Sequence, residues 1–208
     1  MSPDLLPIIE ERVRSRTPFT SDLDPVMRAA VALVIAPEGD DLSALLIERA
    51  QHPLDPWSGH MAFPGGRHDA TDASLERTAI RETLEEVGID LVRDGRYVAR
   101  LDEVQAQARG KDLDMVISPF VFFLDRMQAP TPDASEVADA LWVPLRVFGD
   151  ERYKGTTHFS RDGFGMDFPA FLYQGKTVWG LTYRILCGFL EAIAGIDQQA
   201  AASGSDAD

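Results

Sequence analysis

Short apolar runs alternate with polar segments containing glycine or proline along most of the chain. Residues 29–35 form one such run, Ala-Ala-Val-Ala-Leu-Val-Ile, which is bounded by Pro37 and Gly39 and predicts a buried strand. The same reasoning predicts further strands at residues 43–49, 97–107, 116–124 and 140–144. The polar turn at residues 38–41 is expected to join the first two strands as a hairpin.

The strongest helical pattern runs over residues 73–87, where apolar positions recur at helical spacing. Shorter helices with an apolar face are expected at residues 7–16 and 181–194. Residues 52–59 and 129–135 contain prolines and predict loops, whereas the aromatic, glycine-rich stretch 153–173 shows too little periodicity to assign. Strands interleaved with helices predict an α/β fold, a sandwich built on a mixed β-sheet.

The length of 208 residues fits one domain with a sizeable core. We expect an N-terminal helix and connector at residues 1–24, one domain at residues 25–196 and a disordered, small and polar tail at residues 197–208. No apolar run approaches the ~18 residues of a membrane span, and no basic-then-apolar leader is seen. A cytoplasmic location without membrane contact is therefore expected.

The net charge of −14 limits the kinds of partner. Nucleic-acid phosphates would be repelled, so the charge argues against non-specific binding of DNA or RNA. A small phosphorylated substrate stays open, because a bound divalent cation reverses the local field. The one cysteine, Cys187, excludes an intrachain disulfide and a thiolate-rich zinc site, and its apolar neighbours predict a buried side chain.

A glycine turn directly precedes the strongest helix. The sequence Pro64-Gly65-Gly66 lets backbone groups approach a ligand closely. At about 100° per residue, three carboxylates of the helix share an arc of about 100°, and three apolar residues are expected on the opposite face, in the core. The carboxylates belong to Glu82, Glu85 and Glu86, and the apolar residues are Ile80, Leu84 and Val87.

Most acidic runs are solvated faces, but two physical points favour a metal site here. Like charges three and four residues apart repel one another. Acidic side chains in the last turn also oppose the helix dipole, ahead of the expected C-cap Gly88. Together these effects cost about 1–2 kcal/mol without a cation. Carboxylate oxygens suit Mg²⁺ or Mn²⁺, which also bind substrate phosphates.

Residues 81–89, Arg-Glu-Thr-Leu-Glu-Glu-Val-Gly-Ile, resemble the signature of the Nudix hydrolases. That pattern is Gly-x5-Glu-x7-Arg-Glu-U-x-Glu-Glu-x-Gly-U, with U aliphatic; Thr83 departs from it. Gly66 lies one residue further from Arg81 than the pattern has, and Asp72 stands in place of the first Glu. The resemblance implies an α/β/α sandwich with a mixed β-sheet between helices, so that residues 25–196 are the Nudix hydrolase domain.

The longer spacing and the Asp are typical of the coenzyme A pyrophosphatase-like branch of that family. Leu45-Leu46-x-x-Arg49-Ala50, Phe63-Pro64-Gly65-Gly66, Trp142-Val143-Pro144-Leu145 and Val178-Trp179-Gly180-Leu181-Thr182 are similar to segments of this branch. The chain also departs from it in the loop at residues 52–59, which lacks the usual Arg and carries one extra residue, while His60 replaces a Gln.

The resemblance implies a metal-binding set on the helix. The implied ligands are the carboxylates of Glu82, Glu85 and Glu86, with a carbonyl of Gly66 or Gly65 as a further ligand. Glu85 and Glu86 are also implied as catalytic residues, and the implied cofactor is Mg²⁺ or Mn²⁺.

Other roles come with alternatives. Arg81 is expected to orient the glutamates, although a purely structural ion pair explains it equally well. Glu136, in a late loop, is the best further candidate for a base or ligand; an exposed loop carboxylate is the alternative. Trp179 is expected in core packing or a dimer contact rather than against substrate. The residues expected to contact substrate are Arg49, His60, Gly65 and Arg67.

The resemblance implies that water attacks a phosphorus of a diphosphate, and three functions are compatible with it. The first is a pyrophosphatase that cuts coenzyme A or acyl-coenzyme A into 3',5'-ADP and a phosphopantetheine. The second is hydrolysis of ADP-ribose, a dinucleotide or a nucleoside triphosphate. The third, a non-catalytic sensor, is disfavoured by the intact glutamates. The partner is a small nucleotide-derived molecule in each case, and family precedent adds a homodimer.

Overall fold

Alternation along strand β1 (Met27–Glu38) determines the layered architecture. Leu33 and Ile35 are fully buried in one hydrophobic cluster, whereas Ala32 and Val34 are fully buried in another. Because successive side chains of a strand point to opposite faces, a strand covered on both faces must be apolar throughout. The strand predicted at residues 29–35 is confirmed.

The computed structural model describes residues 1–23, 27–52, 57–108, 111–161 and 164–194. In chain order after a short 3₁₀ turn η1 (Pro3–Leu5), the elements are α1 (Leu6–Ser15), β1 (Met27–Glu38), β2 (Asp41–Arg49), β3 (Met61–Ala62), β4 (Gly65–Arg67), α2 (Leu75–Val87), β5 (Gly95–Arg100), β6 (Val104–Ala108), β7 (Lys111–Leu124), β8 (Val137–Pro144), α3 (Leu145–Gly149), η2 (Glu151–Tyr153), β9 (Lys154–Arg161), β10 (Phe164–Tyr173), β11 (Lys176–Trp179) and α4 (Gly180–Ala192).

Eight strands of the described ranges form one mixed sheet, in which β3, β2, β1, β7 and β5 lie side by side in that order. Strand β1 runs parallel to β7 and antiparallel to β2, with which it forms the predicted hairpin. The remaining strands extend this sheet: β4 pairs with β1, β6 with β7 and β8 with β2. The short strand β4 is what brings the glycine turn to the centre of the sheet.

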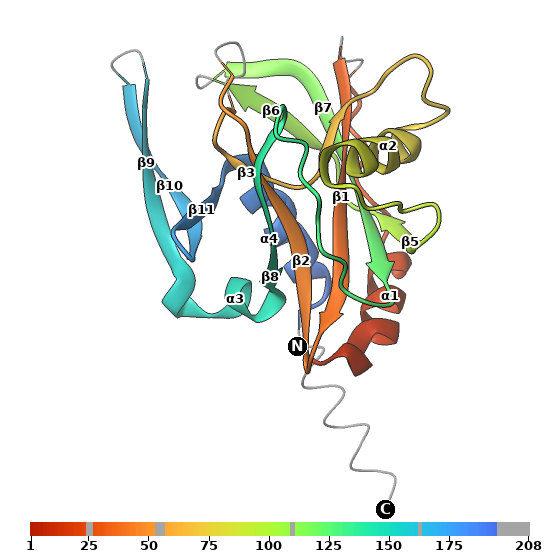
Figure 1. Cartoon of the computed structure of the whole chain (residues 1–208). Coiled ribbons are helices and arrows are strands. Elements are labelled where there is room, and N and C mark those ends of the chain that lie inside the picture. The colour runs from red at the N-terminus through yellow and green to blue at the C-terminus, as the bar shows by residue number, and fades with distance from the viewer. Residues whose placement is uncertain (24–26, 53–56, 109–110, 162–163, 195–208) are drawn as a thin grey trace, which may run out of the picture.

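Helices cover both faces of the sheet (Figure 1). Helix α2 packs on one face through Ala79 and Val87, both fully buried. Helices α1 and α4 pack on the other face, where Ile9 and Phe189 are fully buried in the larger cluster. The fold is thus an α/β/α sandwich around a mixed sheet, and the predicted fold class is confirmed. The tail predicted at residues 197–208 lies outside the described residues.

The region predicted as one strand at residues 97–107 contains two. Strand β5 ends at Arg100, opposite Phe120, and β6 begins at Val104, opposite Ile117. Pro119 of β7 faces the break, and it has no N–H to donate to a neighbouring strand. Its carbonyl instead accepts a hydrogen bond of 2.9 Å from the N–H of Leu101.

The aromatic stretch that gave no sequence prediction forms a second sheet. Strands β9 and β10 are antiparallel along their length, and β11 pairs with the far side of β10. This three-stranded sheet stands beside the edge of the main sheet at β3 (Figure 1). Glycines and prolines within β9 and β10 interrupt the period-two pattern that normally signals a strand, which is why sequence periodicity missed them.

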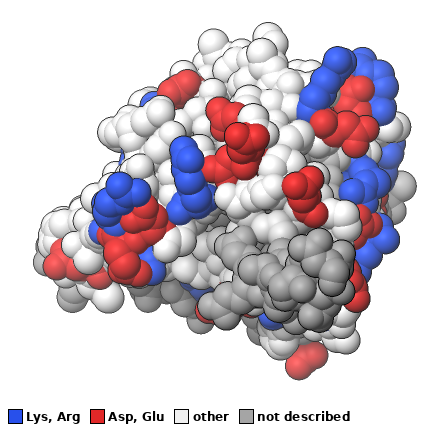
Figure 2. Space-filling model, turned by 90° about the horizontal axis from the view of Figure 1, so that it is seen from below, with Lys and Arg blue, Asp and Glu red and all other residues white. Residues whose placement is uncertain are grey.

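Acidic and basic side chains are interleaved on the face seen in Figure 2, with no broad basic area among the residues drawn there. Arg152 pairs with Asp150, and Arg146 pairs with Asp41. The charges on this face are therefore mixed in sign, and the expectation that the chain does not bind nucleic acid stays a prediction. Among the helices described, none combines the length and the apolar character that a membrane crossing requires.

Candidate active site

The glycine turn is held against the middle of the main sheet. Gly65 pairs with Val31 of β1, and the Pro64 carbonyl accepts a hydrogen bond of 2.8 Å from the N–H of Ala32. Gly65 has a φ of 153°, and a Cβ there would lie 2.3 Å from the carbonyl oxygen of Ala30. Only glycine fits this position, because any side chain would collide with the β1 backbone.

The same turn is in close contact with helix α2. The N–H of Gly65 donates a buried hydrogen bond of 2.8 Å to Oε2 of Glu86. A Cβ on Gly66 would lie 2.4 Å from Oε1 of Glu82. The two glycines therefore allow two helix carboxylates to lie directly on the turn, as the closeness of Pro64-Gly65-Gly66 to the acidic helix suggested.

Helix α2 buries Ile80 and Val87 as expected, but its buried face extends further towards Glu86 than the spacing indicated. The predicted core residue Leu84 is 47% exposed, whereas Thr83 is fully buried and its hydroxyl donates to the Ala79 carbonyl. At about 100° per residue, the buried arc is centred near Thr83 and includes Glu86 at one edge. The prediction for Leu84 was wrong because the helix packs on β1 and β4 through the side that carries Thr83, so that Glu86 rather than Leu84 is buried.

Three carboxylates from two parts of the chain come together beside the turn. Glu82, Glu86 and Glu136 each offer an oxygen within 4.8 Å of those of the other two. We call them the carboxylate trio. Glu86 is only 2% exposed, Glu82 is partly buried and Glu136 is exposed. The structure thus brings the loop residue Glu136 together with two of the three glutamates predicted from the helix.

Backbone hydrogen bonds fix Glu136 in the trio. The last carbonyls of α2 accept from the loop: Val87 from the N–H of Thr131 at 2.8 Å and Glu86 from the N–H of Asp133 at 2.9 Å. These carbonyls have no partner within their own helix, so the loop supplies one. The carbonyl of Glu136 then accepts from the N–H of Ala50 at 2.8 Å, which ties the loop to the end of β2.

The surroundings of Glu82 and Glu86 favour protonation when no cation is bound. The pKa of Glu86 is raised to about 8, mainly by burial and also by the neighbouring carboxylates of Glu82 and Glu136, against the opposing effects of the Gly65 N–H and Arg49. Burial also raises the pKa of Glu82. Crowded, desolvated carboxylates are unstable as anions unless a positive charge lies among them. This donor set of hard oxygens fits a divalent cation such as Mg²⁺ or Mn²⁺.

Arg81 connects the glutamates to the loop before the helix. Its Nη1 lies 2.9 Å from Oε1 of Glu82 and 2.8 Å from Oε2 of Glu85. Its other nitrogens bind Asp72, which is the residue that stands in place of the family's first Glu. The carboxylate of Glu85 is 57% exposed and lies outside the carboxylate trio. Its predicted role as a metal ligand stays a prediction.

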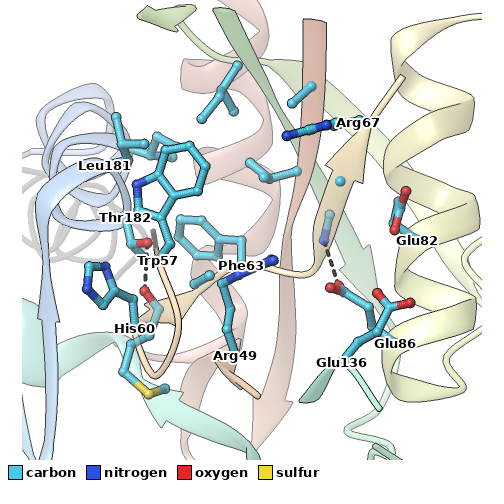
Figure 3. Close-up of a pocket in the computed structure, with 18 of the residues that line it drawn as sticks. Arg49, Trp57, His60, Phe63, Arg67, Glu82, Glu86, Glu136, Leu181 and Thr182 are labelled. Carbon is cyan, nitrogen blue, oxygen red and sulfur yellow. Dashed lines mark hydrogen bonds between the residues drawn. The ribbon is translucent and has the colours of Figure 1, made fainter. Parts of the chain in front are cut away.

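A cavity of about 460 Å³ lies between the trio and the start of helix α4. Glu82, Glu86 and Glu136 occupy one side of it in Figure 3, and Trp57, His60 and Leu181 the other. All four residues predicted to contact substrate line this cavity, together with Gly66; they are Arg49, His60, Gly65 and Arg67. Their predicted roles are not tested by this placement.

Several lining residues were not predicted from the sequence. Trp57, Met61, Leu181, Thr182 and Ile185 all line the cavity. They come from a loop, a two-residue strand and the first turns of α4; Leu181 and Thr182 belong to a segment that resembles the family branch, but the resemblance implies no site role for them. Trp179, expected to be in core packing, also lines the cavity and is half-buried. Its segment resembles the family branch, but the resemblance alone does not show where the Trp179 side chain lies.

Comparison with known proteins gives one matching family and several relatives. Residues 26–161 match the family model described as NUDIX domain. An uncharacterized protein of Schizosaccharomyces pombe is 42% identical over 58% of the chain and 42% of its own length. The human protein called mitochondrial coenzyme A diphosphatase NUDT8 is 33% identical over 65% of the chain and 56% of its own length.

Among solved structures, a MutT/nudix family protein from Enterococcus faecalis superposes with a TM-score of 0.55 at 17% identity, covering 91% of the chain and 69% of that protein. At this identity the similarity concerns the fold alone. The chain spans about two fifths to three fifths of the length of the first relatives it matches.

Proposed function

The chain belongs to the Nudix family, and we propose that it hydrolyses the diphosphate bond of a small nucleoside diphosphate derivative, coenzyme A or an acyl-coenzyme A, with Mg²⁺ or Mn²⁺ as cofactor. The observation that carries the proposal is the convergence of Glu82, Glu86 and Glu136 on one wall of a cavity of ligand size. A non-catalytic binding protein has no need of three mutually repelling carboxylates there.

Residues of three elements would hold the cation. Glu82 and Glu86 supply carboxylate oxygens from α2, Glu136 supplies one from the loop before β8, and the Gly66 carbonyl lies at the turn; Glu85 is a further candidate ligand. A divalent cation bound among these groups neutralises charge on the diphosphate and lowers the pKa of water. The raised pKa of Glu86 implies that its carboxyl releases a proton when the site is filled.

Other side chains of the cavity are proposed to bind the phosphates and to accept the proton of the attacking water. Arg49 and Arg67 line it and are proposed to bind the phosphate oxygens. Glu136 is the most exposed member of the trio and is proposed as the base that takes the proton of the attacking water. The water oxygen bonds to one phosphorus, the bridging P–O bond breaks, and each half of the substrate leaves with one of the two phosphates of the former diphosphate. Arg81 orients Glu82 and Glu85 through its ion pairs.

The choice of a coenzyme A substrate rests on similarity. The printed name of the human relative describes a coenzyme A diphosphatase, and that protein shares 33% identity with this chain. The second candidate, another nucleoside diphosphate derivative such as ADP-ribose, is favoured by the absence of Lys and Arg from residues 52–59. The cytoplasmic location and the homodimer also stay predictions.

A substrate panel tests the proposal. Coenzyme A, acetyl-coenzyme A, ADP-ribose, NADH, diadenosine tetraphosphate and ATP would be assayed with Mg²⁺ and with Mn²⁺. We expect coenzyme A or its thioester to have the highest kcat/KM, with 3',5'-ADP as a product. Highest kcat/KM for ADP-ribose would establish the second candidate, and no turnover of any compound would refute the hydrolase.

A pair of variants on one helix provides the control. Glu86→Gln removes a member of the trio and is expected to lower kcat by at least 100-fold. Glu76→Gln alters a glutamate in the first turn of the same helix, away from the cavity, and should leave kcat unchanged. Equal activity of the two variants would remove Glu86 from the site.

A further inference from the structure

Three half-exposed aromatic rings lie at the side of the cavity away from the carboxylate trio. They belong to Trp57, His60 and Trp179. Trp57 and His60 face the trio across the cavity in Figure 3, and the ring centroids of His60 and Trp179 are 4.7 Å apart. None of these rings has a role in the proposed hydrolytic step. His60 and the loop that ends near Trp57 are also the two places where the sequence differs from the coenzyme A pyrophosphatase-like branch.

The ring of Trp179 is held in place from behind. Phe159 of β9 and Phe168 of β10 lie 5.2 and 5.4 Å from it, so the second sheet supports this wall of the cavity. The hydroxyl of Thr182, three residues further along, donates a buried hydrogen bond of 2.9 Å to the Met61 carbonyl. This bond fixes the start of α4, and with it Trp179, relative to strand β3.

The three partly exposed rings are the largest partly exposed apolar side chains offered to a ligand at this side. The aliphatic side chains of Met61, Met115, Ile117 and Ile185 also line the cavity, but each is at most 8% exposed. Leu181, Val31 and Ala62 are partly exposed aliphatic lining residues, and each is smaller than the rings of Trp57 and Trp179. The hydroxyl of Thr182 already donates to a carbonyl. A flat, aromatic part of a ligand therefore finds more contact here than a flexible chain does.

We infer that Trp179, flanked by His60, determines specificity by stacking on the aromatic base of the nucleotide half of the substrate. The inference deepens the proposed function and rests on it, since the proposed substrate is a nucleoside diphosphate derivative. The base lies against the rings while the diphosphate reaches the carboxylate trio across the same cavity. Base stacking on aromatic side chains tolerates different bases and contributes about tenfold or more to affinity.

Fluorescence of Trp179 gives a direct test that needs no turnover. The chain has three tryptophans, so the double variant Trp57→Phe, Trp142→Phe leaves Trp179 as the reporter. Trp142 lies elsewhere and donates its indole N–H to the Gln128 carbonyl. With Mg²⁺ present, adenosine 5'-diphosphate is expected to quench this emission, and inorganic diphosphate, which has no base, is expected to leave it unchanged. Equal responses to both probes would overturn the inference.

Affinity measurements by calorimetry provide the second test. Trp179→Leu keeps apolar volume but loses the ring, and should weaken binding of adenosine 5'-diphosphate about tenfold, while Trp179→Phe keeps a ring and should stay within about threefold of the wild type. Inorganic diphosphate should bind all three proteins equally. A Trp179→Leu protein that binds adenosine 5'-diphosphate as tightly as the wild type contradicts the stacking role.

The two proposals fail in different ways. If the protein binds adenosine 5'-diphosphate through Trp179 but cleaves no diphosphate, the proposed hydrolase activity is refuted and the base-stacking role is supported. If the protein cleaves coenzyme A, and the KM is the same in the wild type and in Trp179→Leu, the hydrolase activity is supported and the base-stacking role is refuted. Thermal unfolding of each variant shows whether a loss of binding comes from a loss of fold.

Discussion

Asp72 accepts two hydrogen bonds from the guanidinium of Arg81, from Nε to Oδ1 and from Nη2 to Oδ2, both at 3.0 Å. This two-point contact ties the loop after the glycine turn to the helix that carries the glutamates. The hydrogen bonds from Arg81 lower the pKa of Asp72 well below its usual range, and the same guanidinium reaches Glu82 and Glu85. Asp72 is shorter than the Glu of the family pattern, and the spacing from Gly66 to Arg81 is one residue longer. Its carboxylate nevertheless accepts hydrogen bonds from Arg81.

Asp72→Asn is expected to weaken both the fold and the site. The variant removes the charge from a side chain that is only 6% exposed, so the free energy of unfolding should fall by about 1–3 kcal/mol. Arg81 would lose its fixed orientation, and kcat should fall about tenfold. Urea unfolding and steady-state kinetics measure the two effects. Asp69→Asn, on the exposed part of the same loop, serves as the control and should change neither quantity.

Glu85 and Glu86 should differ in what their removal does to the metal-free protein. Glu85 is exposed and paired with Arg81, so Glu85→Gln should change stability by no more than about 0.5 kcal/mol while lowering kcat at least tenfold, as a proposed ligand. Glu86→Gln should instead increase stability at pH 8, because it removes a buried charge. Thermal unfolding in EDTA and kinetics with Mg²⁺ compare them; unaltered kcat in Glu85→Gln would remove Glu85 from the ligand set.

Stability without metal should depend on pH through Glu86. Its pKa is about 8 in the folded chain against 4.5 ordinarily, so the folded chain holds more protons than the unfolded chain between those values. The free energy of unfolding should therefore decrease as pH rises from about 4.5 to 8, by at most about 1.4 kcal/mol per unit for this group, and level off above. Glu82, whose pKa is also raised, contributes in the same direction.

Urea unfolding at pH 5 to 9 in EDTA measures this dependence. Glu86→Gln should flatten it, since the titrating group is absent. Added Mg²⁺ should have its largest stabilising effect at high pH, where no proton has to be displaced. A wild-type slope that persists unchanged in Glu86→Gln would show that other groups cause it.

Gly66→Ala tests the close contact between the turn and the helix. The added Cβ would lie 2.4 Å from the carboxylate of Glu82 and must displace it, so Mn²⁺ affinity should fall at least tenfold. The φ of Gly66 is not positive, so the backbone itself tolerates alanine. Gly188→Ala is the matched control: its Cβ meets nothing within 4 Å, and in helix α4 it should increase stability by about 0.5–1 kcal/mol. Calorimetric titration with Mn²⁺ and thermal unfolding give both readouts.

The sequence alone determined the local parts of the site. Helical spacing puts Glu82 and Glu86 one turn apart, and the two glycines before the helix identify where backbone and carboxylates come close. Strands β1 and β2 and helix α2 were also predictable, because each contains a continuous apolar run or a helical repeat of apolar residues that can be recognised within the segment itself.

Only the tertiary structure decided which side chains meet. Glu136 joins the trio because its loop binds the last carbonyls of α2, a contact across about fifty residues that no local pattern encodes. The packing of α2 on β1 and β4 buries Glu86 and leaves Leu84 and Glu85 exposed, although all three share the last turns of one helix. Trp179 lines the cavity because a separate sheet supports it. The burial of Glu86 and the crowding of the carboxylates arise from such long-range packing. The raised pKa values of Glu82 and Glu86 therefore could not be derived from residue spacing alone.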